Sequence, residues 1–542
     1  MSSSPAHSWV VTKAIPALLL LIFALQCTWF IRTQSLTFDE PVHIAEGMDA
    51  WRNGRFEQYN DHPPLARLLC ALPLINPKWQ VDVQQLPDTF RIPRISPDPV
   101  SLAWRARAMN MLLGLLLGFL VWLEARKQFS AAAANFALAL FAFAPSLIAH
   151  FSLATTDGAA ALLIFAAAIQ VHRYKSRRSW GSAGLTGVIL GLLLLAKFST
   201  VPMFGLAVAL LLVNRRQQVL RPWKWNWAKC AGTVAVALFV VWAGYFFHIS
   251  RLTIRDHVLT ASHPHWNSQL VKPTRNRLKI SIPVPAGEYV AGFRDLVFHN
   301  AHGQRAFFLG QVSPTGGWKS YYPVTILLKW PLLLLLSSLT GLIFWLWGEV
   351  RFQPESWIIF LFPALYFGLA IFSHFNIGER HILPLYPFAL LLAAGFADWL
   401  YRKRFGVIVL GGLVLLNAAD CIRYAPGYLS YMEIFVKPAA TYRLLSDSNV
   451  DWGQGLLALR EYQAQHPAEQ IWLAYFGSVD PAIYGIHAQP LGENQHPSGT
   501  VVVSATNFSG QYLHDPGSYR WLLQHKPVRV LDHCMYVFEV KE

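Results

Sequence analysis

Long apolar blocks are the feature of this sequence that most constrains its fold. A helix needs about 20 mostly apolar residues to cross the hydrocarbon of a bilayer, and about eleven blocks approach or exceed that length. They run over residues 10–31, 103–123, 131–149, 158–171, 181–196, 200–213, 228–247, 323–347, 357–372, 382–400 and 405–419. Only 14% of the residues are charged, against about a quarter in a soluble protein. The blocks therefore predict a polytopic α-helical membrane protein with about eleven transmembrane helices.

The distribution of basic residues predicts the orientation of these helices. The first block is longer than the apolar core of a signal peptide and no small-residue cleavage site follows it, so we interpret it as a retained signal anchor. If it runs outward, the short inner loops are rich in Lys and Arg, whereas the short outer loops hold only Lys197 and Arg380. Lys and Arg stay in cytoplasmic loops, which predicts a cytoplasmic N-terminus, an outer C-terminus and a bacterial inner membrane. The same loops account for the net charge of +15 without a nucleic-acid partner.

Three large segments then lie on the outer face, namely residues 32–102, 248–322 and 421–542. We predict a transmembrane catalytic region over residues 1–420 and an extracytoplasmic C-terminal domain over residues 421–542. In this tail, strand-like and helix-like stretches alternate, which favours a small α/β domain. The expected strands are 470–475, 500–504 and 536–540, and the expected helices are 456–465 and 517–524. We interpret the polar segment 446–454 as a cap of the following helix rather than an acceptor site.

Two groups of acidic residues stand at the outer ends of apolar blocks. Asp39 and Glu40 follow the first block, and the same loop continues with His62 and a double proline that opens a helix carrying Arg67. The apolar stretch after Arg67 predicts that this helix lies on the membrane face. Asp157 opens the fourth block, where capping of the helix is the plain alternative. Juxtamembrane acids are often only solvated, but two acids at one membrane depth are also able to converge on one site.

Cations occur at the same level of the predicted membrane. They are Arg105, Arg107, Lys197, Lys329 and Arg380. Charges at this depth are costly and invite a functional interpretation, although snorkelling explains Arg105 and Lys329. Acids and cations together suit an anionic lipid head group that faces an acid-activated nucleophile.

These motifs resemble a known family. Phe38-Asp39-Glu40, His43 and the Asp61-His62-Pro63-Pro64-Leu65 stretch resemble the first outer loop of the protein O-mannosyltransferase-related family, glycosyltransferase family 39 of the GT-C superfamily. Residues 149–157 resemble its second acidic motif, and residues 309–329 and 378–387 resemble later outer segments of bacterial members. The likeness covers roughly residues 10 to 435. One departure is Arg67, where the family usually carries Lys, which keeps the charge but changes the donor geometry.

The resemblance implies an inverting hexosyl- or pentosyl-transferase that takes a sugar from a polyprenyl-phosphate donor on the outer face. The acceptor is a hydroxyl of a protein, a lipid or a glycan. A hydroxyl gains from a carboxylate base, and we assign this role to Asp39, with Glu40 orienting the acceptor or the loop and Asp157 assisting. For the donor phosphate we favour Arg67, then Arg107, Lys197 and Arg380. His62 is assigned either to the sugar or phosphate or to a structural role beside the prolines.

We expect no cofactor. Asp39, Glu40 and Asp157 offer oxygen ligands for a divalent metal, but this branch of the superfamily is generally considered metal-independent. The five cysteines show no metal-binding spacing, and Cys421 and Cys534 are able to pair if the outer compartment is oxidising. The alternative function is a lipid or solute transporter or flippase. Transporters usually show paired internal repeats, which this sequence lacks.

Overall fold

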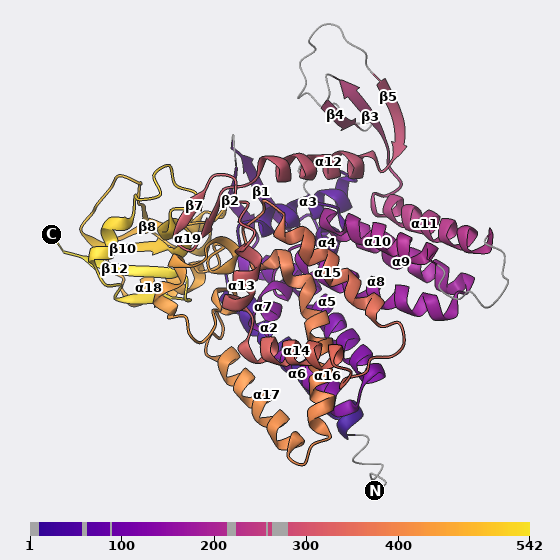
Figure 1. The fold of residues 1–542 in the computed structure, drawn as a ribbon. Helices are drawn as coiled ribbons and strands as arrows, with labels where there is room; N and C mark the ends of the chain where they lie inside the picture. The colour runs from indigo at the N-terminus through magenta and orange to yellow at the C-terminus, as the bar shows by residue number, and fades with distance from the viewer. Residues whose placement is uncertain are drawn as a thin grey trace.

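The computed structural model describes residues 10–56, 62–86, 89–213, 224–255, 258–262 and 280–541. A body of packed helices carries a mixed sheet, formed by the C-terminal tail, on one side, and a small three-stranded sheet extends from one end (Figure 1).

Helices cover all of the apolar blocks. In chain order they are η1 Val10–Ala14, α2 Ile15–Thr33, α5 Pro99–Gln128, α6 Ala131–Ala142, α7 Pro145–Phe151, α8 Asp157–Arg177, α9 Trp180–Ala196, η3 Phe198–Thr200, α10 Val201–Leu212, α11 Lys224–Gly244, α13 Tyr321–Lys329, α14 Leu332–Leu346, α15 Trp357–Ile371, η4 Glu379–Leu385, α16 Tyr386–Tyr401 and α17 Gly406–Ile422. The prediction of a mostly helical fold is confirmed.

The number of spans that helix length supports is smaller than the number of apolar blocks. Among the described residues, 4 helical stretches are long and apolar enough to cross a membrane, or up to 6 if each bent pair counts as one span. Several other apolar helices have only 10–17 residues. The expected count of about eleven is therefore not confirmed.

Two blocks expected as single spans are broken. The chain bends by 64° between α6 and α7 and by 117° between α13 and α14. Pro145 stands at the first position of α7, and Pro331 immediately precedes α14. Proline lacks the N–H that would continue the preceding helix and its ring clashes with the preceding turn, so the helix ends there and a new one begins.

Small residues allow the helices of the body to approach closely. The buried positions of α6 and α8 are rich in Ala. A Cβ added to Gly341 in α14 would lie 2.0 Å from the carbonyl oxygen of Leu392 in α16, so these two backbones are in direct contact. Small residues at helix contacts are typical of membrane proteins, where van der Waals packing drives helix association.

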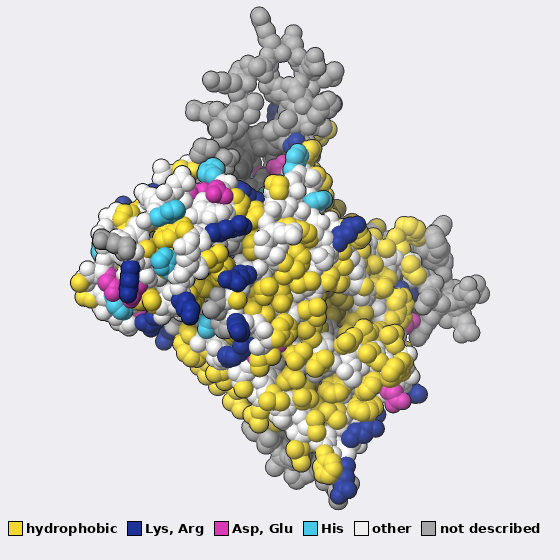
Figure 2. All heavy atoms as spheres, turned by 60° about the vertical axis from the view of Figure 1, so that its left-hand side comes forward, with side chains coloured by type: hydrophobic (Ala, Val, Ile, Leu, Met, Phe, Trp, Pro, Cys, Tyr) yellow, Lys and Arg dark blue, Asp and Glu magenta, His cyan; other side chains and the backbone are white. Residues whose placement is uncertain are grey.

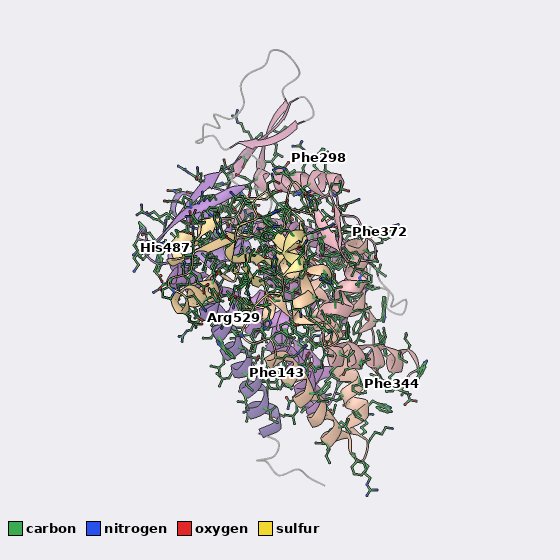
Figure 3. The ribbon with its side chains drawn as sticks, turned by 90° about the vertical axis from the view of Figure 1, so that its left-hand side faces the viewer. Phe143, Phe298, Phe344, Phe372, His487 and Arg529 are labelled. Atoms are coloured by element: carbon green, nitrogen blue, oxygen red, sulfur yellow. The ribbon has the colours of Figure 1, made fainter. Side chains whose placement is uncertain are left out.

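The predicted inner loops meet one another. Arg173 at the end of α8 forms an ion pair of 3.0 Å with Glu124 of α5, and the side chain of Gln128 accepts a hydrogen bond of 2.9 Å from the backbone of Gln353. In Figure 3, Phe298, in a predicted outer segment, lies toward one end of the molecule, and Phe344 of α14 lies toward the other.

The first predicted outer segment contains two helices and a hairpin. Its elements are α3 Glu40–Asn53, α4 Leu65–Ala71, η2 Leu72–Leu74, β1 Gln80–Gln85 and β2 Phe90–Ser96. The helix expected after the double proline is α4. A Cβ on Gly47 of α3 would lie 2.1 Å from the carbonyl oxygen of Arg67, so α3 packs directly on the backbone of α4.

The second predicted outer segment forms its own small sheets. Its elements are β3 Ile249–Arg255, β4 Val258–Ser262, β5 Ile280–Pro285, α12 Gly287–His302, β6 Ala306–Phe308 and β7 Gln311–Ser313. The first three strands pair in the order β4-β3-β5, and β6 pairs with β7.

The tail forms a five-stranded sheet in the order β11-β12-β10-β8-β9. Its elements are η5 Tyr428–Ser430, η6 Pro438–Arg443, η7 Asp447–Asn449, α18 Leu456–Gln465, β8 Ile471–Ala474, η8 Pro481–Tyr484, β9 Gln489–Pro490, β10 Gly499–Ser504, α19 Ala505–Ser509, η9 Arg520–Gln524, β11 Arg529–Leu531 and β12 Met535–Val540. Strands β8, β10 and β12 and helix α18 lie where they were expected. The expected helix at 517–524 is instead the short 3₁₀ turn η9.

The tail shares its core with the helical body. Trp452, Val501 and Phe538 of the tail belong to the same buried cluster as Phe23 and Leu390 of the helices. The tail is therefore packed onto the body rather than tethered to it.

The surface separates into an apolar region and a polar region (Figure 2). Hydrophobic side chains cover much of the visible face of the helical body, while Lys and Arg gather along its borders. On α17, Ile408 and Leu415 are more than two-thirds exposed. A continuous exposed apolar surface of this kind fits contact with lipid.

The five cysteines all fall within the described residues and are all free and buried. Cys421 donates a weak hydrogen bond of 3.6 Å to the side chain of Gln26 instead of pairing with Cys534. The disulfide that the sequence left open is absent from this structure.

Candidate active site

The backbone that leads to Asp39 is held by the tail. The amide of Ser35 donates to the carbonyl of Gln454 at 2.9 Å, and the amide of Phe38 donates to the carbonyl of Trp452 at 2.8 Å. The Ser478 hydroxyl donates to the carbonyl of Phe38 at 2.7 Å. Three hydrogen bonds to residues far along the chain thus fix the stretch that ends immediately before Asp39.

Asp39 stands just before α3 with its carboxylate partly open. The side chain is 28% exposed, and its Oδ2 accepts a hydrogen bond of 2.9 Å from Nη1 of Arg380. The Arg380 guanidinium in turn lies 4.0 Å from the centre of the Trp452 ring. An accessible carboxylate beside a fixed cation is able to accept a proton from a bound hydroxyl.

Glu40 and Arg107 form a fully buried pair away from the open carboxylate. Nη2 of Arg107 lies 2.7 Å from Oε2 of Glu40, and both side chains are 0% exposed. Arg107 also donates to the carbonyls of Gln34 and Ser35, and Glu40 accepts from the amide of Ala154 at 2.7 Å. The expected contact of Arg107 with a donor phosphate needs correction, because burial and these hydrogen bonds occupy its guanidinium. The pair instead ties the first outer loop to α5 and to the turn before α8.

Asp157 and Lys197 form a second, buried pair. Asp157 is the first residue of α8, and its Oδ1 accepts a hydrogen bond of 2.6 Å from Nζ of Lys197 at the end of α9. Among the described residues, Oδ2 of Asp157 has no hydrogen-bond partner, and the start of α8 has no side-chain cap. The plain capping interpretation of Asp157 is therefore wrong.

Arg380 connects the two pairs. Its charge interacts with the carboxylates of Asp39, Asp157 and Asp447. Asp39, Asp157, Lys197 and Arg380, predicted from four separate outer turns, therefore converge on one place.

Arg67 and His62 lie in a neighbouring group. Arg67 is buried in α4, forms an ion pair with Glu46 and donates from Nε to Nδ1 of His43 at 3.2 Å. The His43 and His62 rings lie 5.5 Å apart between centroids, and His62 interacts electrostatically with His381, the residue after Arg380. Asp61, the acid of the same motif, lies outside the described residues.

Lys329 does not snorkel. It is buried, and its Nζ donates to the carbonyls of Leu429, Tyr431 and Asn449 at 2.9, 2.7 and 2.6 Å. The expectation failed because these acceptors come from a segment about 100 residues away, which a local view of the helix does not contain. The ammonium attaches α13 to the tail.

The segment 446–454 is not a helix cap. The N-cap residue of α18 is Gly455, which has no side chain, and the amide of Leu456 donates to Oγ of Ser35 at 3.1 Å rather than to a side chain of the segment. The segment packs instead on the turn that carries Arg380: Asn449 Oδ1 accepts from the amide of Glu379 at 2.9 Å, and a Cβ on Gly378 would lie 2.0 Å from Oγ of Ser448. Sequence reasoning missed this role, although the density of polar residues in the segment was its signal.

Asp447 adds a third carboxyl group beside Arg380. It is buried, and its Oδ2 accepts a hydrogen bond of 2.5 Å from the hydroxyl of Tyr512. Burial raises the pKa of Asp447 above its ordinary value, although the charge of Arg380 acts in the opposite direction. Within the described residues, no group of three or more His, Cys, Asp or Glu side chains has a metal-binding arrangement.

Comparison with known proteins finds a matching family model and similar solved structures. A sequence model described as dolichyl-phosphate-mannose-protein mannosyltransferase matches residues 16–255. The S. cerevisiae protein O-mannosyltransferase Pmt1-Pmt2 complex bound to the sugar donor is similar in structure, with 12% identity, a TM-score of 0.52, and coverage of 90% of this chain and 95% of that chain. No curated protein matches in sequence.

Two structures of ArnT from Cupriavidus metallidurans also align. The one bound to undecaprenyl phosphate has 14% identity, a TM-score of 0.46 and coverage of 98% of each chain. The apo structure has 15% identity, a TM-score of 0.45, and coverage of 99% of this chain and 98% of that chain. The fold is similar to that of the yeast protein O-mannosyltransferase complex. The resemblance to the protein O-mannosyltransferase family is confirmed over residues 16–255.

Proposed function

We propose that this protein is an inverting glycosyltransferase that moves a sugar from a polyprenyl-phosphate donor to a hydroxyl acceptor. The observation that carries the proposal is the convergence of two ion pairs, Asp39 with Arg380 and Asp157 with Lys197, linked through the charge of Arg380. The family match over residues 16–255 and the sugar donor bound to the yeast complex support the same class of reaction.

Each residue has a chemical task in this reaction. Asp39 takes the proton of the acceptor hydroxyl while the hydroxyl oxygen forms a bond to the anomeric carbon. The bond from that carbon to the phosphate breaks, and the phosphate leaves with the electron pair. Arg380 and Lys197 stabilise the charge that develops on the phosphate. A phosphate is a weak base, so this transfer needs no second carboxylic acid, unlike inverting glycoside hydrolysis.

The remaining candidates act around this centre. Asp157 orients Lys197, while Arg67 and His62 belong to the neighbouring group of side chains. Glu40 and Arg107 position the loop and do not touch substrate, since neither side chain is exposed. The donor sugar is a hexose or a pentose, and the acceptor is a protein, a lipid or a glycan.

We propose that the site faces the outer side of a bacterial inner membrane, with about eleven spans and a cytoplasmic N-terminus. The position of Asp157 in the first turn of α8, with Lys175 and Arg177 in its last turn, supports this orientation. For the alternative, transport of a lipid or solute, the described part of the chain offers no observation in its favour.

The decisive experiment uses the purified full-length chain in lipid nanodiscs with a panel of radiolabelled polyprenyl-phosphate hexoses and pentoses. We expect donor-specific release or transfer of one sugar, and no loss of activity with a chelator. Asp39→Asn should abolish transfer. Asp49→Asn is the matched control, because Asp49 lies on the helix that follows Asp39 and accepts a hydrogen bond from Asn53, four residues away at the surface. Near-normal transfer by Asp39→Asn would defeat the assignment.

A further inference from the structure

Trp452 of the tail supports the cation of the site with one face of its ring. The residue is 1% exposed, and the Arg380 guanidinium carbon lies 4.0 Å from the ring centre. A cation over an indole face is attracted to the ring, most strongly where water is excluded. Arg380 is itself buried, so Trp452 and Asp39 together set the direction of its guanidinium.

A tight turn holds the indole in place. The Trp452 amide donates to Oε1 of Gln454 at 2.7 Å, and Nε2 of Gln454 donates to the carbonyl of Val450 at 2.9 Å. Gly453 has a φ of 92°, a conformation that favours glycine, and a Cβ there would lie 2.8 Å from the hydroxyl of Tyr475. The ring therefore has little freedom to move away from Arg380.

The same tail holds Asp39 from its other side. The Phe38 ring stacks on Phe476 at 5.3 Å with an interplanar angle of 13°, and Phe476 stacks on Tyr512 at 5.2 Å and 5°. The Ser478 hydroxyl binds the Phe38 carbonyl, and the Trp452 carbonyl binds its amide. Both members of the Asp39–Arg380 pair are thus held by Trp452, Phe476 and Ser478.

We propose that Trp452 and Ser478 are positioning residues of the transferase, Trp452 for the cation that receives the donor phosphate and Ser478 for the carboxylate that receives the acceptor proton. This inference rests on the proposed function. It makes the tail a part of the catalytic centre, with separate effects on donor binding and on turnover.

Donor binding is tested with undecaprenyl phosphate as the probe, titrated into the purified full-length chain in detergent. Trp452→Leu should weaken binding about tenfold, because the guanidinium loses its support. Trp452→Phe keeps an aromatic face and should bind within about threefold of the wild type. Trp472→Leu, in β8 of the same tail, is the control for general loss of packing and should leave the affinity unchanged. Thermal denaturation of each variant confirms that the protein is folded.

The Ser478 arm uses transfer rather than binding. Ser478→Ala should lower kcat several-fold with the affinity for undecaprenyl phosphate unchanged, and Ser478→Thr should restore kcat. A merely structural role would instead lower the active fraction of every variant, with no difference between leucine and phenylalanine at position 452.

The outcomes separate this inference from the function beneath it. If the wild type binds undecaprenyl phosphate and Asp39→Asn is inactive, but folded Trp452→Leu binds as tightly as the wild type, the positioning role is wrong and the function stands. If the wild type does not bind the probe and Asp39→Asn transfers sugar normally, both fail.

Discussion

Replacing Glu40 by Gln removes one charge from a pair whose side chains are both fully buried. Oε2 of Glu40 accepts from the amide and the hydroxyl of Thr37 and from Nη2 of Arg107, and Oε1 accepts from Nε of Arg107 and the amide of Ala154. The glutamine side chain replaces one of these two oxygens by an NH₂ group. That group is a donor, so it is unable to accept the hydrogen bonds that the oxygen accepted. Breaking a buried pair by removing one partner costs about 3–5 kcal/mol, and we expect Glu40→Gln to lower the free energy of unfolding by about that amount.

Glu124→Gln is a matched control. Glu124 is also buried, at 3% exposure, but its partner Arg173 is 38% exposed and remains hydrated when the pair is broken. Glu124→Gln should therefore lower the free energy of unfolding by about 1 kcal/mol or less. Both variants are measured by reversible unfolding of the purified protein in mixed micelles with increasing SDS.

Replacing both partners of the first pair by apolar residues should not rescue stability. In Glu40→Leu with Arg107→Met, the amides of Thr37 and Ala154 and the carbonyl of Ser35 lose their partners. Each buried group left unsatisfied costs about 1–3 kcal/mol. A Glu40→Gln protein that is as stable as the wild type but inactive in transfer would refute this reasoning and make Glu40 a catalytic residue.

Three further predictions concern the contacts of the tail. Gly378→Ala places a Cβ 2.0 Å from Oγ of Ser448, so the rate of sugar transfer should fall by about tenfold. The double variant Gly378→Ala with Ser448→Gly should recover part of this rate. Full activity of the single variant would contradict the close approach. Lys329→Met leaves three buried carbonyls without their shared donor and should lower the free energy of unfolding, measured in the SDS titration, by at least about 2 kcal/mol. An unchanged free energy of unfolding would mean that the ammonium is hydrated. Burial raises the pKa of Asp532 to about 7 from 3.8, so the folded protein holds a proton that the unfolded chain releases, and stability should fall as the pH rises from about 4 to 7 and then level off. Burial also raises the pKa of Asp451 to about 6, so Asp532→Asn should reduce this slope without removing it; equal slopes in the two proteins would count against the Asp532 assignment.

The sequence was sufficient to locate the helices and the principal acids. Apolar blocks predict helices because a backbone in lipid must satisfy its own hydrogen bonds, and helices cover every predicted block. Asp39 and Asp157 stood out because acids are scarce in such a chain. In the structure Asp39 pairs with Arg380 and Asp157 pairs with Lys197, and their assignment to an active site stays a prediction.

The sequence was not sufficient to assign partners. Arg107 and Arg380 both stand at the outer end of an apolar block, but only the fold shows that Arg107 is enclosed with Glu40 while Arg380 pairs with the partly exposed Asp39. Trp452 had no local signal, since one aromatic residue among many becomes informative only when its neighbour in space is known. The support of Arg380 by the tail is a contact between segments that no local pattern joins.

The hydrogen bond between Ser478 and the carbonyl of Phe38 joins residues 440 positions apart. At a synthesis rate of about 5–20 residues per second, roughly 20–90 s pass between the appearance of the first partner and the appearance of the second. During that interval the nascent chain already has Asp39 but lacks the residue that binds the backbone beside it. If Ser478 positions Asp39 as we propose, a nascent chain is unable to transfer sugar until this part of the tail has been made.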